Sequence, residues 1–117
     1  MKPKVAIIFT GGTISMTVDE KVGAAIPTLT GSQILSMVSN IDKLAEIEVI
    51  EYADIPGPHM TIDRLMDIRS LIQDLVKRND ISGVIITHGT DSLEETAYFL
   101  DLTINTSKPV VVVGAMR

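Results

Sequence analysis

The stretch Val84-Ile85-Ile86-Thr87-His88-Gly89-Thr90-Asp91-Ser92-Leu93-Glu94-Glu95-Thr96 decides the fold. It begins as a continuous run of β-branched apolar residues, which is typical of a strand buried on both faces. The run breaks at Gly89 and restarts as a helix, in which Asp91 or Ser92 can cap the amino end and the two glutamates suit the helix dipole. The sequence therefore predicts a strand, a turn and a helix, with a hydroxyl beside a carboxylate in the turn.

The rest of the chain repeats this alternation of strand and helix. Apolar runs predict four strands, over Val5–Phe9, Ile47–Tyr52, Gly83–Thr87 and Val110–Val113. Helical periodicity predicts three helices, over about Gly31–Val38, Ile62–Lys77 and Leu93–Thr103, the first two capped by Thr30 and Thr61. Continuous apolar strands that alternate with helices predict an α/β fold, with an open, mainly parallel sheet and helices on both faces. We expect one Rossmann-like or flavodoxin-like domain over residues 1–117.

One segment departs from this regular spacing. Residues 14–30 show no clear period, and loops of that length in compact domains are usually functional or disordered. Their glycine, hydroxyl and charged side chains suit a mobile lid, which is the interpretation we favour. The alternative is a solvated β-hairpin without a role.

Composition limits the classes of partner and the compartment. The 117 residues are 45% hydrophobic with a net charge of −5, and lysine and arginine form no cluster. Nucleic acid and anionic membranes are therefore unexpected partners. The absence of cysteine excludes disulfides and thiolate metal sites, and the apolar run Val5–Phe9 is too short for a signal peptide or a membrane span. We expect a cytoplasmic protein.

Polar and glycine-rich sequences follow all four predicted strands. They are Thr10-Gly11-Gly12-Thr13, Asp54-Ile55-Pro56-Gly57-Pro58-His59-Met60, Thr87-His88-Gly89-Thr90-Asp91 and Gly114-Ala115-Met116-Arg117. Ligands of open α/β sheets bind at the carboxyl ends of the strands, so this pattern indicates a small polar substrate. The first sequence lacks the lysine of a phosphate loop and the third glycine of the dinucleotide fingerprint. His59 and His88 have no partner at metal-ligand spacing, so we expect hydrogen-bonded loop histidines and no metal site.

Three of these sequences also resemble a known family. Thr10-Gly11-Gly12-Thr13-Ile14, then Thr87 to Ala97, then Val113-Gly114-Ala115-Met116-Arg117 look like the successive signatures of the bacterial-type L-asparaginase family, the asparaginase/glutaminase family. The resemblance implies hydrolysis of L-asparagine to L-aspartate and ammonia, often with some glutaminase activity. It also implies that no metal or organic cofactor takes part, and that the enzyme is a homo-oligomer, a dimer or a tetramer.

The resemblance assigns catalytic roles to three residues. Thr13 matches the family's nucleophilic threonine, at the edge of the lid. Thr90 and Asp91 match the second threonine and its neighbouring aspartate, which move protons together with a lysine. Asp91 would also hold the α-ammonium group of the substrate through a charge-assisted contact.

Four further positions are assigned to substrate binding. Gly57 and Pro58 match the segment that binds the α-carboxylate of the substrate. Backbone N–H groups around Gly89 and Thr90 would polarise the amide carbonyl, as an oxyanion hole does. Ala115 matches a position whose backbone carbonyl approaches the side-chain amide.

The chain also departs from the family pattern. The family's catalytic lysine lies beyond the Gly-Ala-Met-Arg signature, where this sequence ends, and Lys108 precedes the fourth strand. The family's small C-terminal domain and lid tyrosine are missing, and Gly57 replaces a frequent serine. We therefore expect the N-terminal piece of a longer enzyme, inactive alone. Two alternatives stay open: the ammonia-generating subunit of a glutamyl-tRNA amidotransferase, and a non-catalytic amino-acid-binding module.

Overall fold

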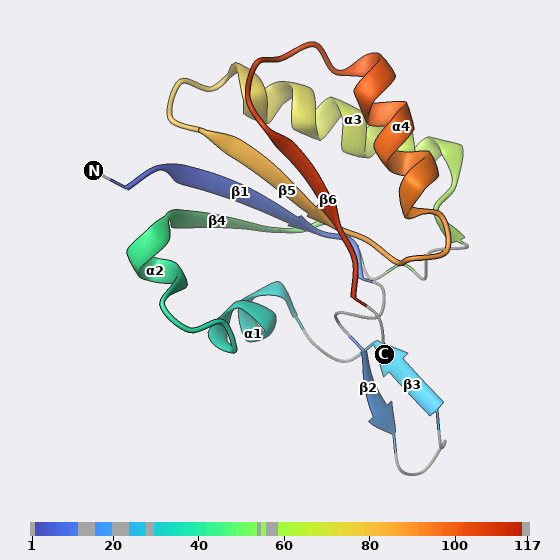
Figure 1. The fold of residues 1–117 in the computed structure, drawn as a ribbon. Coiled ribbons are helices and arrows are strands. Elements are labelled where there is room, and N and C mark those ends of the chain that lie inside the picture. The colour runs from blue at the N-terminus through green and yellow to red at the C-terminus, as the bar shows by residue number, and fades with distance from the viewer. Residues whose placement is uncertain are drawn as a thin grey trace.

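A computed structural model describes residues 2–11, 16–19, 24–27, 30–53, 55 and 59–115. Four parallel strands form one sheet in the order β4-β1-β5-β6 (Figure 1). These strands are β1 (Lys4–Phe9), β4 (Glu46–Glu51), β5 (Gly83–Thr87) and β6 (Val110–Val113). The helices are α1 (Gly31–Ser36), α2 (Ile41–Leu44), α3 (Ile62–Lys77) and α4 (Leu93–Thr103). The predicted α/β fold with a parallel sheet is thus confirmed.

Most predicted boundaries agree with the structure. The strand predicted at Ile47–Tyr52 begins and ends one residue earlier, and the bounds of α3 and α4 are those predicted. The first helix ends at Ser36 instead of Val38, and the short helix α2 was not predicted. The chain turns between them at Asn40, whose φ of 64° is a left-handed conformation that asparagine tolerates better than most residues.

Helices lie on both faces of the sheet, but they cover the two faces unequally. Helices α3 and α4 pack side by side over one face, and α1 and α2 lie on the other, near β4 (Figure 1). The buried core lies under α3 and α4. It contains Ala6, Ile8, Val84 and Ile86 from the strands and Ile68, Ile72, Leu75 and Leu100 from the helices. On the opposite face Val111 and Val113 remain 49% and 38% exposed.

The helix caps predicted at Thr30 and Thr61 are confirmed, at the starts of α1 and α3. The Thr30 hydroxyl accepts a hydrogen bond from Gln33 N, and the Gln33 side chain accepts one from Thr30 N at 2.8 Å, which completes a capping box. The Thr61 hydroxyl accepts from Arg64 N at 3.3 Å. Ser92 occupies the N-cap position of α4, although its side chain makes no capping hydrogen bond there.

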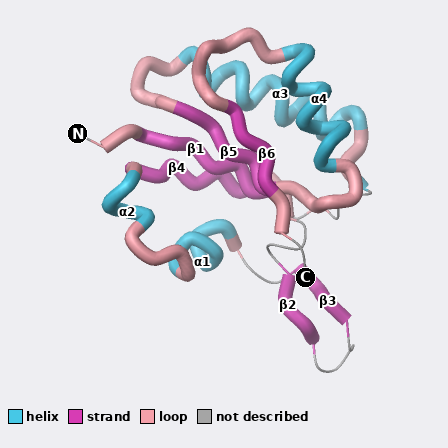
Figure 2. The backbone as a smooth tube through the Cα atoms, in the orientation of Figure 1, coloured by secondary structure: helices cyan, strands magenta, loops and turns pink. Residues whose placement is uncertain are grey.

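The segment without a clear sequence period contains a β-hairpin. Strands β2 (Met16–Asp19) and β3 (Ala24–Pro27) pair antiparallel, with Met16 opposite Pro27, and are drawn apart from the main sheet in Figure 2. The hairpin geometry is that of the alternative interpretation given above, and strands of four residues are too short to show a clear period of two. The role of this hairpin as a lid stays a prediction.

An ion cluster joins the amino ends of β1 and β4 to the turn before β5. Arg78 donates to both oxygens of Asp80, at 3.0 and 2.7 Å, and to Glu48 Oε1 at 3.0 Å. Lys4 Nζ lies 3.4 Å from Asp80 Oδ2 and 3.7 Å from Glu48 Oε2. The hydrogen bonds from Arg78 lower the pKa of Asp80 to about 2, and they also lower the pKa of Glu48.

This cluster predicts a loss of stability in acid. Because the pKa of Asp80 is lower in the folded chain than its ordinary value of 3.8, its stabilising effect is complete above about pH 5 and disappears toward about pH 2. Urea unfolding across this range should show the free energy of unfolding of wild type falling more steeply than that of Asp80→Asn. Asp74→Asn, which changes an exposed carboxyl on α3, is the matched control. Equal slopes for wild type and Asp80→Asn would contradict the prediction, and added salt should reduce the difference.

Candidate active site

The carboxyl ends of β1 and β5 flank the point where the chain reverses its direction across the sheet. From β1 the chain moves to its neighbour β4, and then returns past β1 to β5 and β6. The connection after β1 leads to α1 on one face, and the connection after β5 leads to α4 on the other (Figure 1). Ligands of open α/β sheets bind at such a switch point. The ends of β1 and β5 are therefore the expected place for a binding site.

Buried hydrogen bonds hold these two strand ends together. The Thr10 hydroxyl donates to Thr87 O at 2.5 Å, and Thr10 N donates to Thr87 Oγ1 at 3.3 Å. Both threonines are buried, with exposed fractions of 0% and 3%. The loop after β4 joins the same point, because Ile55 N donates to Thr10 O at 2.6 Å. The segments after β1, β4 and β5 thus start from one rigid junction.

The fourth strand reaches the same place. His88 N donates to Val113 O at 2.9 Å, so that the end of β6 lies beside the turn that follows β5. A Cβ atom on Gly114 would lie only 3.0 Å from His88 O, Thr90 Cγ2 and Leu93 Cδ1. Glycine at this position therefore allows the exit of β6 to pack directly against Thr90.

The structure places four of the predicted site residues at this edge. Thr90 and Asp91 are exposed at the carboxyl end of β5, between that strand and α4, while the preceding Gly89 is buried. Ala115 follows the closely packed Gly114 and is half-buried. A residue with a hydroxyl and a residue with a carboxylate are thus exposed at this edge, next to a backbone that the surrounding contacts hold in place.

Three other predicted site residues cannot be placed. Thr13, Gly57 and Pro58 lie outside the described residues. The nearest described residue to Thr13 is Gly11, whose φ of 98° favours glycine. The Gly57-Pro58 segment lies between the described residues Ile55, which is buried, and His59, which is exposed.

The histidine of the β5 turn is hydrogen-bonded, as expected. His88 is fully buried; its Nδ1 lies 2.6 Å from Gly89 O and its Nε2 lies 2.8 Å from Thr96 Oγ1. Thr96, which is 1% exposed on the inner face of α4, was not predicted from the sequence. The available signal was its place one turn before Leu100, where a polar side chain that faces the core needs a partner.

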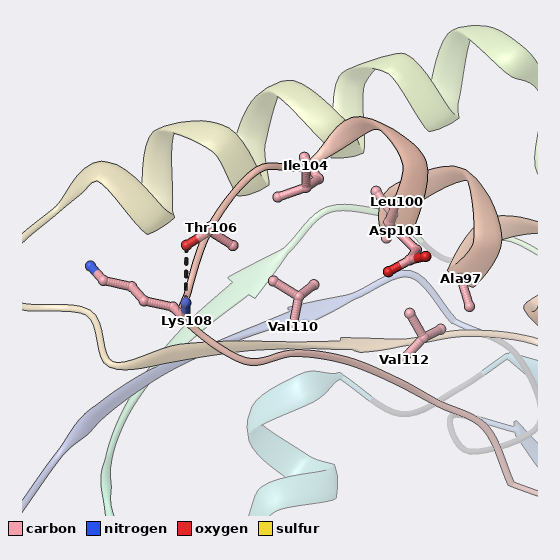
Figure 3. Close-up of a pocket in the computed structure, with 8 residues that line it drawn as sticks. All are labelled: Ala97, Leu100, Asp101, Ile104, Thr106, Lys108, Val110 and Val112. Carbon is pink, nitrogen blue, oxygen red and sulfur yellow. Dashed lines mark hydrogen bonds between the residues drawn. The ribbon is translucent and has the colours of Figure 1, made fainter.

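Lys108 lies at the opposite end of the sheet from these residues. It precedes β6, and its Nζ donates to Arg78 O at 2.6 Å, near the amino end of β5. It also lines a cavity of about 300 Å³ between α4 and β6, together with Asp101 and Thr106, although its amino group extends away from the other lining residues (Figure 3). Lys108 is therefore remote from Thr90 and Asp91, and the expectation that it does not replace the family lysine stays a prediction.

The described ranges contain neither a metal-binding cluster nor a helix that could span a membrane. Within them, no group of three or more histidine, cysteine, aspartate or glutamate side chains has an arrangement that could hold a metal ion. None of the helices in the same ranges has the length and apolar character needed to cross a membrane.

Comparisons with known proteins identify the family. Residues 4–117 match the family model described as "Asparaginase, N-terminal". The chain is 39% identical over 117 residues to the L-asparaginase of Bacillus licheniformis, covering 100% of this chain and 36% of that protein. It is 36% identical over 121 residues to the glutaminase-asparaginase of Acinetobacter glutaminasificans, covering 99% of this chain and 36% of the relative.

A solved structure agrees with these sequence relatives. A crystal structure described as "Probable Cytoplasmic L-asparaginase" from Campylobacter jejuni matches with a TM-score of 0.90 and 40% sequence identity, over 99% of this chain and 36% of that one. The chain thus spans about a third of the length of these relatives. The family predicted from the three sequence signatures is confirmed: the chain belongs to the asparaginase family.

Proposed function

We propose that the protein containing this chain hydrolyses L-asparagine to L-aspartate and ammonia. The observation that carries the proposal is the position of Thr90 and Asp91, which are exposed at the switch point between β1 and β5. The names of the relatives, L-asparaginase and glutaminase-asparaginase, support the same reaction.

In this proposal, hydroxyl and carboxylate groups share the chemistry. Thr13 attacks the side-chain amide carbon. Thr90 and Asp91 take part in removing the proton from the attacking hydroxyl, because an unassisted threonine is a weak nucleophile. Backbone N–H groups at Gly89 and Thr90 stabilise the negative charge that develops on the carbonyl oxygen. Ammonia then leaves, and water hydrolyses the covalent intermediate to release aspartate.

The other proposed contacts orient the substrate. Asp91 pairs with its α-ammonium group, and Gly57 with Pro58 binds its α-carboxylate through the backbone. The carbonyl of Ala115 accepts a hydrogen bond from the side-chain amide. Neither a metal nor an organic cofactor takes part.

We propose further that activity belongs to the complete protein and not to this chain alone. The proton relay needs a lysine, and Lys108 is held at the far end of the sheet by Arg78. Similarity to a protein named as cytoplasmic supports the same location here. A homo-oligomer, a dimer or tetramer, is proposed as the assembly, and the exposed apolar side chains Tyr98 and Leu102 on α4 offer a surface for it.

The test is a coupled assay of ammonia and aspartate, run with the complete protein on L-asparagine. Equal amounts of the two products are expected. L-glutamine is the comparison substrate, because one relative is named glutaminase-asparaginase. Binding of aspartate or asparagine by calorimetry without any release of ammonia would refute hydrolysis and favour an amino-acid-binding module.

A further inference from the structure

The buried ring of His88 connects helix α4 to the peptide that precedes Thr90. It sits between β5 and the exposed Thr90-Asp91 pair, and both ring nitrogens have a partner. Gly89 O lies 2.6 Å from Nδ1, and Thr96 Oγ1 lies 2.8 Å from Nε2. Since the ring and the Thr96 side chain are 0% and 1% exposed, water does not compete for these hydrogen bonds.

These partners determine where the ring proton lies. A carbonyl oxygen can only accept a hydrogen bond, so Nδ1 must carry the proton and donate to Gly89 O. In the neutral ring Nε2 is then an acceptor, and the Thr96 hydroxyl donates to it. The two hydrogen bonds thus run in the same direction: the Thr96 hydroxyl on α4 donates to the ring, and the ring donates to the backbone of the turn.

The hydrogen bond to Gly89 O constrains the next residue through the peptide plane. The Gly89–Thr90 peptide is planar and trans, so its C=O and its N–H point in opposite directions. Holding the carbonyl against the buried ring therefore directs the Thr90 N–H away from the ring. Glycine allows a wider range of backbone conformations than other residues, so without this bond the peptide before Thr90 would be less restricted.

We infer that His88 and Thr96 are positioning residues, which fix the orientation of the Gly89–Thr90 peptide and so of the Thr90 N–H and side chain. The inference rests on the proposed function insofar as the oriented groups act on the substrate amide. The imidazole itself does not contact the substrate. The ring affects the reaction by fixing the direction of the Thr90 N–H and the position of the Thr90 hydroxyl.

The decisive variant is Thr96→Val in the complete protein, since valine keeps the shape of threonine and removes the hydroxyl. We expect kcat on L-asparagine to fall by between about tenfold and a hundredfold, because small misplacements of reacting groups are costly, with a smaller change in KM. Hydrogen–deuterium exchange should rise in the peptide that covers Gly89 to Asp91. Thr96→Ser keeps the hydroxyl and should recover most of the rate and the protection from exchange.

Thr103→Val is the matched control on the same helix. The Thr103 hydroxyl donates to Phe99 O at 2.7 Å within α4, away from the turn, so its loss should leave kcat and exchange at Gly89–Asp91 unchanged. If Thr96→Val does not fold, Thr96→Ala removes the same hydroxyl without adding bulk and is measured in its place. A folded variant without the hydroxyl that keeps wild-type kcat and wild-type exchange overturns the inference. A wild-type protein that releases no ammonia refutes the proposed function only, because the exchange measurement still decides the role of His88 and Thr96.

Discussion

Replacing Thr13 by alanine is expected to lower ammonia release from L-asparagine by at least about a thousandfold in the complete protein, as loss of the nucleophile does in other hydrolases. Alanine has no hydroxyl to attack the amide, and the remaining groups can only assist direct attack by water. The α-ammonium contact proposed for Asp91 is untouched by this change. The affinity for aspartate, measured by calorimetry, should therefore stay close to that of wild type.

The serine variant separates attack from packing. Thr13→Ser keeps a hydroxyl at the same position and should retain part of the rate, whereas Thr13→Ala should retain almost none. If Thr13→Ala turns over at the wild-type rate, Thr13 is not the nucleophile. If Thr13→Ala loses affinity for aspartate as strongly as it loses rate, Thr13 binds the substrate and another group performs the attack.

The sequence predicted the sheet and its strand ends well, because both depend on local patterns. The unbroken apolar run Val84–Ile86 and the glycine after His88 locate the end of β5 without reference to any distant residue. The parallel direction of the strands then brings their carboxyl ends to one edge. Placing Thr90 and Asp91 near the exit of β6 required only this topology, and the contact between Gly114 and Thr90 agrees with it.

The contacts that make the site rigid could not be predicted in the same way. Thr10 and Thr87 are 77 residues apart, and their paired hydrogen bonds depend on the register of β1 with β5, in which Phe9 lies opposite Thr87. The bond between His88 and Thr96 depends equally on how α4 turns over the sheet. Sequence periodicity shows which face of a helix packs on the sheet, but it does not give the distance from the Thr96 hydroxyl to a nitrogen of the His88 ring. Helix α2 was not predicted, and the hairpin of β2 and β3 was given only as an alternative, because these four-residue elements lack the continuous apolar run that locates the equally short β6.

Gly31→Ala should destabilise the fold by about 1–3 kcal/mol, as overpacking a filled site does. Gly31 is buried at the first position of α1, where its N–H donates to Glu51 Oε1. A Cβ atom there would lie 2.7 Å from both Glu51 Oε1 and Phe9 Cε2, and closer still to Phe9 Cδ2. The Phe9 ring is only 4% exposed and belongs to the central strand β1, so it has little room to move. Because Phe9 directly precedes Thr10, we also expect the displaced ring to disturb the junction of strand ends and reduce activity.

Helix propensity and overpacking predict opposite signs for the effect of Gly31→Ala on stability. Helix propensity alone favours alanine over glycine by about 0.5–1 kcal/mol, so an account without the Phe9 contact predicts that Gly31→Ala stabilises the protein. Urea unfolding, with the slope compared between variants, decides between the two signs. Ser32→Ala is the matched control, since Ser32 is the next residue of α1 and is exposed; its replacement should change stability by less than about 0.5 kcal/mol. A Gly31→Ala protein as stable as wild type would mean that α1 can shift away from β1, and that the contact between Gly31, Phe9 and Glu51 does not fix the start of this helix.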